Sequence, residues 1–403
     1  MPNANVLSFE AGSGDAIKTA LPRLKIAVRN RVFSAAGGGA ERYSVSLVEQ
    51  LAQRHEIHVF AQTIEHHWPG VVYHPVSGPL TRSGWINQLW FATASWWMTR
   101  QGFDIVHSHE NTWHGDVQTA HVLPVKHNLL KGKSGLRRAL AWLGIVISPR
   151  LTTYVWLEHK RFAPQRRRSV IASSPSLAQA LVQAYPDVPQ PIPVITPGVT
   201  ATTLAATRDE KSLARKRLGL PPFGPCILLA GNDYRKKGLG ALISALAKLP
   251  EKSFLAVAGK GTQQAQFLEQ ARAAGVDSRV FFLGLQKDLT DAYRACDVLA
   301  HPTLEDTFAM VVLEAMAHGV PVVVSQARYC GIADLLVHAH DALILHNPQD
   351  AAELSQCLSR ILSDEPLREH LVANGLAFAR QRQWVDIAAS QEAVYVALCK
   401  PSL

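Results

Sequence analysis

The sequence predicts an α/β protein with two domains, each built on a parallel β-sheet. The chain has 403 residues, which is long enough for two separate hydrophobic cores. Short apolar and β-branched runs alternate with stretches whose apolar residues recur at helical spacing, and this alternation is typical of parallel sheets. A Pro-rich stretch at residues 186–199 lies near the middle of the chain, and we expect the domain junction after it, at residues 198–211.

The first domain is expected at residues 23–200 and the second at 201–382. Residues 1–22 lack the basic-then-apolar order of a signal sequence, and we expect a disordered extension there. Strands of the first domain are predicted at 24–30, 56–61, 71–76, 104–108, 117–122, 169–173 and 193–196. Strands of the second domain are predicted at 226–231, 254–258, 279–283, 298–301, 321–325 and 342–346.

The segment 301–325 places carboxylates on both sides of one predicted helix start. Glu305 and Asp306 lie in a polar turn after an apolar run, and Glu314 lies within the helix predicted at 308–317. Ionised carboxylates only accept hydrogen bonds, so they suit a ligand that offers hydroxyl groups at two ends, as a nucleotide sugar does. A surface helix with an acidic first turn is the alternative, but helix polarity does not account for Glu314 among apolar residues.

A basic loop at 232–238 follows the predicted strand 226–231 and precedes a helix with apolar residues at helical spacing. Lys236 and Lys237 therefore lie where a strand turns into a helix. Cations at this place would stabilise the negative charge that develops on a departing nucleoside diphosphate, without a metal ion. A lone Lys-Lys-Gly is usually solvated loop charge, so the prediction depends on its order relative to Glu314.

A glycine triplet, Gly37, Gly38 and Gly39, follows the first predicted strand and precedes a helix. Glycine at such a turn lets the backbone approach a phosphate closely, although an isolated triplet is more often a flexible turn. The pattern is not GxGxxG, and no acidic residue follows at the usual distance, so the sequence does not indicate a nicotinamide cofactor.

Together these motifs resemble those of retaining GT-B glycosyltransferases of family 4, from about residue 24 to the end of the chain. The segments NDYRKKGLGALISALAKLPE, DVQTAH and YVWLEHKRF are similar to lipopolysaccharide core glucosyltransferases in particular. The resemblance implies the GT-B fold, in which two Rossmann-like domains face each other across a cleft, with a last helix at about 383–403 that crosses back onto the first domain. It also implies metal-independent transfer of a hexose, expected to be glucose, from a UDP-sugar to a glycan or glycolipid acceptor.

The resemblance assigns roles in the second domain. Glu314 would hold the ribose, and free N–H groups at the helix start, those of Phe308, Ala309 and Met310, would face the sugar and phosphate. Strict Asp-x7-Glu spacing selects Asp306 for the first acidic position, whereas the family usually has Glu, and Glu305 lies one position earlier. We predict that Glu305 contacts the hexose and that Asp306 caps the helix.

Lys236 takes a place that usually holds Arg, whose bidentate grip an ammonium group cannot reproduce, and Lys237 matches the Lys before Gly. In the first domain, the resemblance assigns Gly38 and Gly39 to a loop that closes over the donor. It assigns His121 to the donor sugar.

Four histidines lie within fifteen residues, at positions 107, 109, 114 and 121, but their spacing matches no zinc pattern, so no metal is expected. We retain His109, Glu110 and Asp116 as acceptor-side candidates. Five cysteines without a CxxC motif favour a reducing, cytoplasmic location.

The net charge is confined to the first half of the chain. Residues 1–200 contain 20 Lys and Arg against 11 Asp and Glu, and the remainder contains 21 of each, so the whole excess of +9 lies in the first half. An anionic partner is therefore expected there: a phosphorylated glycolipid or oligosaccharide acceptor, met at the anionic cytoplasmic face of the inner membrane. Nucleic acid is the rival, but no recognition motif is present. No apolar run reaches the ~18 to 20 residues of a membrane span.

An apolar stripe, formed by Trp85, Ile86, Leu89, Trp90, Ala94 and Trp97, is expected to pack against the first sheet, with one Trp exposed at an interface. Two other function classes remain open besides the transferase. One is a non-catalytic protein that binds a nucleotide sugar or an anionic lipid, which the displaced acidic register and Lys236 would favour. The other is a GT-B-like sugar-nucleotide epimerase.

Overall fold

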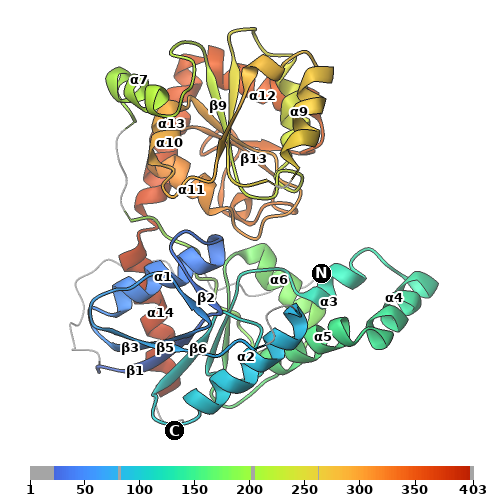
Figure 1. Cartoon of the computed structure of the whole chain (residues 1–403), viewed down its shortest axis with the longest axis vertical. Coiled ribbons are helices and arrows are strands. Elements are labelled where there is room, and N and C mark those ends of the chain that lie inside the picture. Colours follow the sequence, from blue (N-terminus) through green and yellow to red (C-terminus); the bar gives the residue numbers. More distant parts are fainter. Residues whose placement is uncertain (1–21, 80–82, 201–204, 262, 400–403) are drawn as a thin grey trace. The chain divides into compact units, whose positions relative to one another are not determined.

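The computed structural model describes residues 22–79, 83–200, 205–261 and 263–399, and the chain forms two compact units (Figure 1). Unit 1 contains the chain up to Pro197 together with the segment from Trp384 onward, and unit 2 contains Gly198–Gln383. The expected junction at 200/201 lies within three residues of this division. The disordered extension expected at 1–22 lies outside the described residues, apart from Pro22.

Unit 1 is built on a six-stranded parallel sheet with the strand order β5-β3-β1-β6-β7-β8. Its strands are β1 (Lys25–Arg29), β3 (Glu56–Ala61), β5 (Val71–Pro75), β6 (Ile105–Ser108), β7 (Val117–Ala120) and β8 (Ser169–Ala172), and a separate parallel pair joins β2 (Val32–Phe33) to β4 (Thr63–Ile64). The strand predicted at 193–196 is absent, and Val194 forms only an isolated bridge with Ala172. Pro193 and Pro197 have no N–H to donate, which prevents a longer ladder.

Successive strand residues point to opposite faces of this sheet, and most of them are buried. Helices therefore cover both faces. Phe91 packs with Ala27 and Val106 on one face, whereas His107 contacts Tyr395 on the other. The helices are α1 (Gly39–Leu51), α2 (Gly84–Thr99), α3 (Val125–Leu130), α4 (Gly135–Ile147), α5 (Pro149–Phe162), α6 (Pro175–Ala184) and α14 (Trp384–Cys399).

The last helix, α14, belongs to unit 1, where the crossover helix was expected. The Tyr395 hydroxyl lies 2.7 Å from Nδ1 of His107. Glu392, which is buried, lies 2.9 Å from Nε2 of His55 and 2.7 Å from the guanidinium of Arg54. Unit 1 is therefore assembled from two distant stretches of the chain.

Unit 2 repeats the same topology with the strand order β11-β10-β9-β12-β13-β14. Its strands are β9 (Cys226–Ala230), β10 (Phe254–Ala258), β11 (Val280–Gly284), β12 (Val298–His301), β13 (Val322–Ser325) and β14 (Leu343–Leu345). Helices α8 (Leu239–Leu246), α9 (Gln264–Ala273) and α12 (Ala351–Ser363) cover one face, and α7 (Arg208–Arg217), α10 (Thr290–Ala295), α11 (Met310–Ala317) and α13 (Glu365–Arg380) cover the other (Figure 1). Short 3₁₀ helices lie at Asp277–Arg279 and Gly331–Leu335. The strand order reverses between β9 and β12, and ligands of such sheets bind where the carboxyl ends of these two strands separate.

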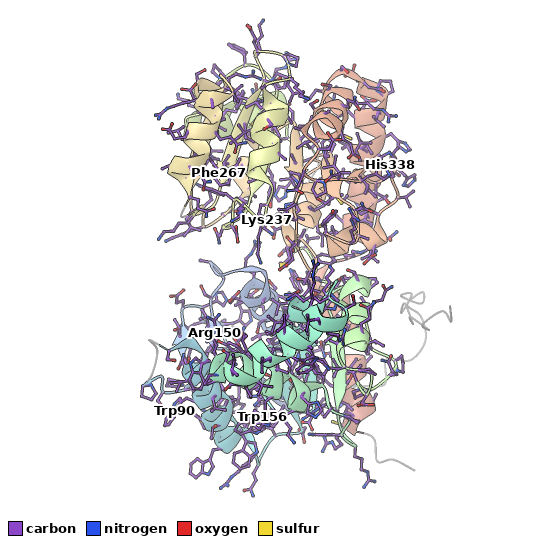
Figure 2. All side chains as sticks on the ribbon, turned by 90° about the vertical axis from the view of Figure 1, so that its right-hand side faces the viewer. Trp90, Arg150, Trp156, Lys237, Phe267 and His338 are labelled. Carbon is purple, nitrogen blue, oxygen red and sulfur yellow. The ribbon has the colours of Figure 1, made fainter. Side chains whose placement is uncertain are left out.

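The apolar stripe predicted on α2 does not form the core, which corrects that expectation. Trp90 and Trp97 are 41% and 64% exposed. The buried face of α2 instead contains Asn87 and Gln88, because each finds a partner: Asn87 exchanges two hydrogen bonds with Gln62 at 2.9 Å, and Gln88 donates to the main chain of Asn111 at 2.9 Å. Figure 2 shows Trp90 and Trp156 on unit 1.

Helix α4 exposes most of its apolar side chains. Four of them recur at helical spacing and are between 56% and 76% exposed: Leu136, Leu140, Leu143 and Ile147. In the described part of the chain, no single helix has the length and apolar character to cross a membrane; α4 and α5 together pass that test but are bent by 98°. An exposed stripe of this kind marks an interaction surface.

Candidate active site

Two loops of unit 2, those after β9 and β12, are joined by hydrogen bonds. The main-chain oxygen of Lys236 accepts from Leu304 N at 2.7 Å and from Thr303 Oγ1 at 3.0 Å. Gly238 allows this approach: its φ is 78°, and a Cβ at this position would lie 2.0 Å from the Pro302 oxygen. The contact brings the two predicted lysines beside the two predicted carboxylates of the turn.

The four side chains form two ion pairs of different character. Lys236 Nζ lies 3.1 Å from Glu305 Oε1, and both side chains are about half exposed, at 54% and 42%. Lys237 pairs with Asp306, and these two side chains are 20% and 15% exposed. His301, which is fully buried at the end of β12, lies 3.1 Å from the same Asp306 oxygen. The first pair is open to exchange with a ligand, whereas the second is largely enclosed by protein.

The environment of Asp306 keeps its carboxylate ionised. Burial alone would raise its pKa, but the hydrogen bond from His301 and the charge of Lys237 outweigh burial and hold the pKa well below its ordinary value. Burial lowers the pKa of His301, so the neutral ring donates through Nε2 to the carboxylate.

The start of α11 differs from the prediction. The helix begins at Met310 rather than at 308, after Ala309, whose φ of 73° is in the left-handed region. Oδ1 of Asp306 accepts from Phe308 N at 3.3 Å and from Ala309 N at 2.9 Å. The N–H groups of Phe308 and Ala309 are thus bonded to this carboxylate and not free to face a ligand, which corrects the expectation for both. Both residues precede the helix, and no side chain caps α11, so the expectation that Asp306 caps the helix is also corrected.

Glu314 lies in the second turn of α11 and is partly exposed. The hydroxyl of Tyr293, from α10, donates to its Oε2 at 2.8 Å. Glu314 and Glu305 therefore have different partners, one on α10 and one in the loop after β9.

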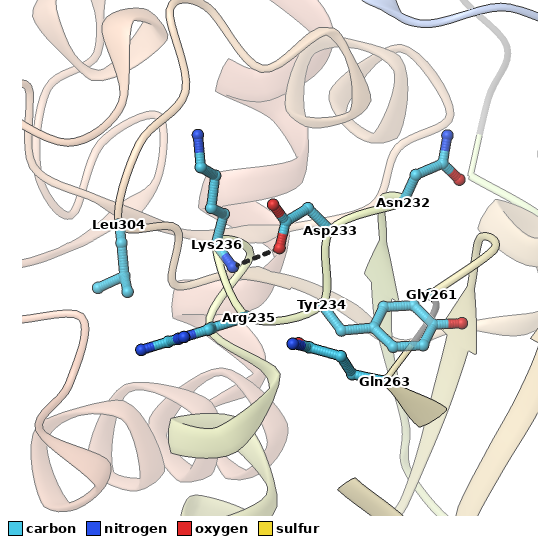
Figure 3. A pocket seen from close by; sticks show the side chains of 8 residues that line it. All are labelled: Asn232, Asp233, Tyr234, Arg235, Lys236, Gly261, Gln263 and Leu304. Carbon is cyan, nitrogen blue, oxygen red and sulfur yellow. Dashed lines mark hydrogen bonds between the residues drawn. The ribbon is translucent and has the colours of Figure 1, made fainter. Parts of the chain in front are cut away.

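A pocket of about 530 Å³ opens beside Lys236 (Figure 3). It is lined by the loop 232–236 with Gly261, Gln263 and Leu304. Tyr234 is fixed there, because its hydroxyl donates to the Gly259 oxygen at 2.6 Å and its ring fills the space where a Cβ of residue 261 would lie. The pocket gives a ligand access to the ammonium group of Lys236.

In unit 1, three histidines gather at the carboxyl ends of β6 and β7. His109 Nδ1 lies 2.8 Å from His121 Nε2, and the rings of His107 and His109 are 4.2 Å apart. Burial lowers the pKa of His121 to about 3 and the pKa values of His107 and His109 well below their ordinary value, so all three are neutral at pH 7. No cluster of three or more potential metal ligands occurs in the described part of the chain.

The other candidates of unit 1 are more scattered. Gly38 and Gly39 lie at the start of α1 and are exposed. Glu110 accepts from the Arg31 main chain at 3.1 Å, and its other oxygen lies 3.5 Å from the Arg31 side chain. Asp116 precedes β7 and accepts from Val106 N at 2.8 Å, which places it at the amino end of that strand, away from the edge with His109 and His121. The acceptor-side expectation for Asp116 is corrected accordingly.

Two residues of the candidate site were not predicted from the sequence. His301 is a polar residue at the end of an otherwise apolar strand, and this position could have identified it. Tyr293 had no such signal, because only the packing of α10 beside α11 brings it to Glu314.

Family models match both units. Residues 210–378 match the model described as glycosyl transferases group 1, and residues 37–203 match glycosyltransferase family 4. A D-inositol 3-phosphate glycosyltransferase of Xylanimonas cellulosilytica is 32% identical over 58% of this chain and 57% of its own length. The lipopolysaccharide glucosyltransferase WaaG of Escherichia coli is 27% identical over 48% of this chain and 53% of its own length. The chain spans a little over half the length of the first curated relatives that it matches.

Solved structures agree on the fold. The crystal structure of WaaG, a glycosyltransferase involved in lipopolysaccharide biosynthesis, has a TM-score of 0.76 at 21% identity and covers 92% of this chain and 98% of its own. Anabaena HepE in complex with UDP-glucose has a TM-score of 0.73 at 20% identity and covers 93% of this chain and 100% of its own. With two Rossmann-like parallel sheets and a glycosyltransferase model matched by each, the chain belongs to the GT-B glycosyltransferases and resembles the lipopolysaccharide core glucosyltransferases.

Proposed function

We propose that the protein is a metal-independent retaining glycosyltransferase that moves a hexose, glucose, from a UDP-sugar to a phosphorylated glycolipid or oligosaccharide acceptor of the lipopolysaccharide core. The observation that supports this most is the contact between the two loops of unit 2, which places Lys236 and Lys237 beside Glu305 and Asp306 at the carboxyl ends of β9 and β12. The names of WaaG and of the HepE complex with UDP-glucose support the choice of donor and acceptor.

Each candidate residue of unit 2 has a proposed role in holding the donor. Lys236 and Lys237 stabilise the departing diphosphate, and the N–H of Met310 faces it at the helix start. Glu305 accepts hydrogen bonds from hydroxyl groups of the hexose, and Glu314 accepts hydrogen bonds from those of the ribose. The exposed pair of Lys236 with Glu305 costs little to separate, since surface ion pairs contribute about 0.2 to 1 kcal/mol.

Asp306 acts on the donor through its neighbours. Its carboxylate is occupied by Lys237, His301 and two main-chain N–H groups, so it fixes the ammonium group of Lys237 and the turn that precedes α11. This arrangement supports Glu305 as the group that contacts the hexose.

The proposed reaction takes place on one face of the sugar. The bond from the anomeric carbon to the phosphate oxygen breaks, the acceptor oxygen bonds to the same face, and the acceptor proton passes to the leaving phosphate oxygen. A retaining glycosidase would need two carboxyl groups about 5 to 5.5 Å apart around the reacting carbon. Here Glu305 and Glu314 have separate partners, Lys236 and Tyr293, which suits holding roles.

Unit 1 is proposed to serve the acceptor. His121 and the Gly38–Gly39 turn keep the roles that the family resemblance assigns to them, and His109 and Glu110 remain candidates for acceptor contacts. The excess positive charge of residues 1–200 favours a phosphorylated acceptor.

The surface of α4 supports a peripheral position on the cytoplasmic face of the inner membrane. The exposed stripe Leu136, Leu140, Leu143 and Ile147 faces solvent, and cationic residues lie nearby at positions 131, 133, 137, 138 and 150. Apolar residues flanked by cations are typical of helices that lie in an anionic membrane interface. Trp90, Trp97 and Trp156 are also exposed, and tryptophan is enriched at the membrane–water interface.

The catalytic proposal is tested with purified protein, UDP-glucose and a core-type phosphorylated acceptor. We expect UDP release that depends on the acceptor, persists in EDTA and yields the donor's anomeric configuration. Lys236→Ala should lower turnover, whereas Lys248→Ala, an exposed lysine at the end of α8, should not. Binding without UDP release would indicate a binding protein, and a changed donor sugar without acceptor would indicate an epimerase. An inverted product or a glycosyl ester on Glu305, Asp306 or Glu314 would refute the mechanism.

The membrane proposal is tested by co-sedimentation with anionic phospholipid vesicles. The double variant Leu140→Gln with Leu143→Gln should sediment less than the original protein, because two apolar contacts with the bilayer are lost. Leu213→Gln on α7 is the matched control, since this leucine is 49% exposed in unit 2. Equal sedimentation of all three proteins would exclude insertion of α4.

A further inference from the structure

The ribose-holding candidate Glu314 is oriented by a residue from another helix. The hydroxyl of Tyr293 donates to Oε2 of Glu314 at 2.8 Å, across 21 positions of sequence. The two residues lie on α10 and α11, which precede and follow strand β12. Tyr293 therefore connects the carboxylate to a part of unit 2 that contributes no other proposed donor contact.

Tyr293 is a rigid support. Its side chain is 2% exposed and lies in the core cluster of this face of the sheet. One side of the ring packs on His318, with 4.9 Å between the ring centroids. Nδ1 of His318 in turn donates to the main-chain oxygen of Glu314 at 2.8 Å, because a carbonyl can only accept. The hydroxyl of Tyr293 is thus held at a fixed place relative to the carboxylate.

A fixed carboxylate binds a diol more tightly than a mobile one. A free glutamate side chain loses rotamer freedom when it binds, and this loss opposes association. An ionised carboxylate offers about four acceptor sites, so a hydrogen bond from one tyrosine leaves its capacity for two ribose hydroxyls. The Tyr293 contact can therefore orient Glu314 without displacing the ligand.

We propose that Tyr293 is a positioning residue for donor binding, whose hydroxyl orients Glu314 toward the two hydroxyl groups of the nucleotide ribose. This inference rests on the proposed function, because it requires that Glu314 contacts the ribose. It adds that nucleotide affinity depends on a buried tyrosine that does not touch the ligand.

The test is a double-mutant cycle read by calorimetry with UDP and with 2′,3′-dideoxy-UDP. Tyr293→Phe keeps the ring and removes the hydroxyl, and we expect it to weaken UDP binding about tenfold, as for the loss of a hydrogen bond to a charged group. Binding of the dideoxy analogue should change little. In the Glu314→Gln background, Tyr293→Phe should have a much smaller effect on UDP.

Tyr395→Phe in unit 1 is the matched control, because it also removes a buried hydroxyl that has a hydrogen-bond partner. UDP binding should be unchanged in this variant. If Tyr293→Phe weakens both ligands equally, or weakens neither, the positioning role is refuted while the ribose assignment stands. If Glu314→Gln itself does not distinguish UDP from the dideoxy analogue, the ribose contact fails, and the positioning role fails with it.

Discussion

The two units have the same sheet order and yet present different chemistry at equivalent edges. In each, the first strand lies beside the fourth main strand, and the loops after these two strands adjoin the point where the order reverses. In unit 2 these loops hold lysines and carboxylates in ion pairs. In unit 1 the corresponding edge holds buried neutral histidines. The shared topology provides the place for a site, and the residues of the loops decide which group each site can bind.

The outer surfaces differ as well. Unit 2 is closed on both faces by helices whose apolar residues are largely buried in two clusters. Unit 1 exposes apolar residues on α2 and α4. This contrast supports the proposed division of roles, in which unit 2 holds the donor and unit 1 meets an amphipathic acceptor.

The largest expected effect distinguishes the largely buried ion pair of Lys237 with Asp306 from the exposed pair of Lys236 with Glu305. Lys237→Ala leaves the largely buried carboxylate of Asp306 without its cation, so the free energy of unfolding should fall by up to about 3 kcal/mol. Turnover should fall by about 10²- to 10³-fold, as when one electrostatic stabiliser of a transition state is removed. Denaturant unfolding and steady-state kinetics measure the two effects.

Lys236→Ala is the comparison for that prediction. Because this lysine is 54% exposed, its loss should lower turnover but change the unfolding free energy by less than about 1 kcal/mol. Equal stability losses for Lys236→Ala and Lys237→Ala would contradict the distinction between the pairs.

The second prediction concerns which carboxylate contacts the hexose. Glu305→Gln should weaken transition-state binding of the donor by about 1.5 to 3 kcal/mol, the range for a hydrogen bond to a charged group, and should reduce selectivity between UDP-sugars. Asp306→Asn should mainly lower stability, since its carboxylate binds Lys237 and His301. Donor competition assays beside unfolding curves distinguish these outcomes, and a reversed pattern would assign the sugar contact to Asp306.

The third prediction uses the histidines of unit 1. Burial lowers the pKa of His107 well below the value of about 6.5 expected in the unfolded chain. Below that pH the unfolded chain binds a proton that the folded unit does not. The free energy of unfolding should therefore fall as the pH drops from about 6.5, by up to about 1.4 kcal/mol per pH unit for each such histidine.

His107→Gln should make this pH dependence shallower. Denaturant titrations at several pH values between about 7 and 5 give the slopes. A slope that His107→Gln does not alter would show that His107 also gains its proton in the folded state.

The smallest effect per substituted residue is expected for membrane binding by the basic surface of unit 1. Replacing Lys131, Lys133, Arg137 and Arg138 by Gln should weaken binding to anionic vesicles by up to about 1 kcal/mol for each charge. UDP affinity should persist, because the proposed nucleotide contacts lie in unit 2. High salt should reduce the difference, since screening acts over about 8 to 10 Å. Unchanged sedimentation would leave this charge as generic surface charge.

Most of the fold could be predicted from local patterns. The strands predicted at 56–61 and 254–258 coincide with β3 and β10, because each is a buried apolar run bounded by polar or turn residues. The prediction for α2 failed because helical periodicity identifies an apolar stripe but not which side faces the core. There Asn87 and Gln88 are buried on the same face as Phe91, and the pairing of Asn87 with Gln62 is not revealed by any local pattern.

The site was predictable in its charged residues and less so in their arrangement. Spacing drew attention to Lys236, Lys237, Glu305, Asp306 and Glu314. It could not show that Asp306 would bond the N–H groups of Phe308 and Ala309, because this depends on a short side chain folding back onto its own turn. Contacts between distant segments, such as that of Tyr293 with Glu314, depend on tertiary packing alone.

The place of α14 in unit 1 has a consequence for synthesis on the ribosome. Unit 2 is one continuous stretch, Gly198–Gln383, and can close its core as soon as that stretch has emerged. Unit 1 begins to emerge first, but the surface of α1 that α14 covers, and the partners of His55 and His107, stay unfilled until Glu392 and Tyr395 have been made. The part of the chain that is translated first is therefore the last to complete its fold.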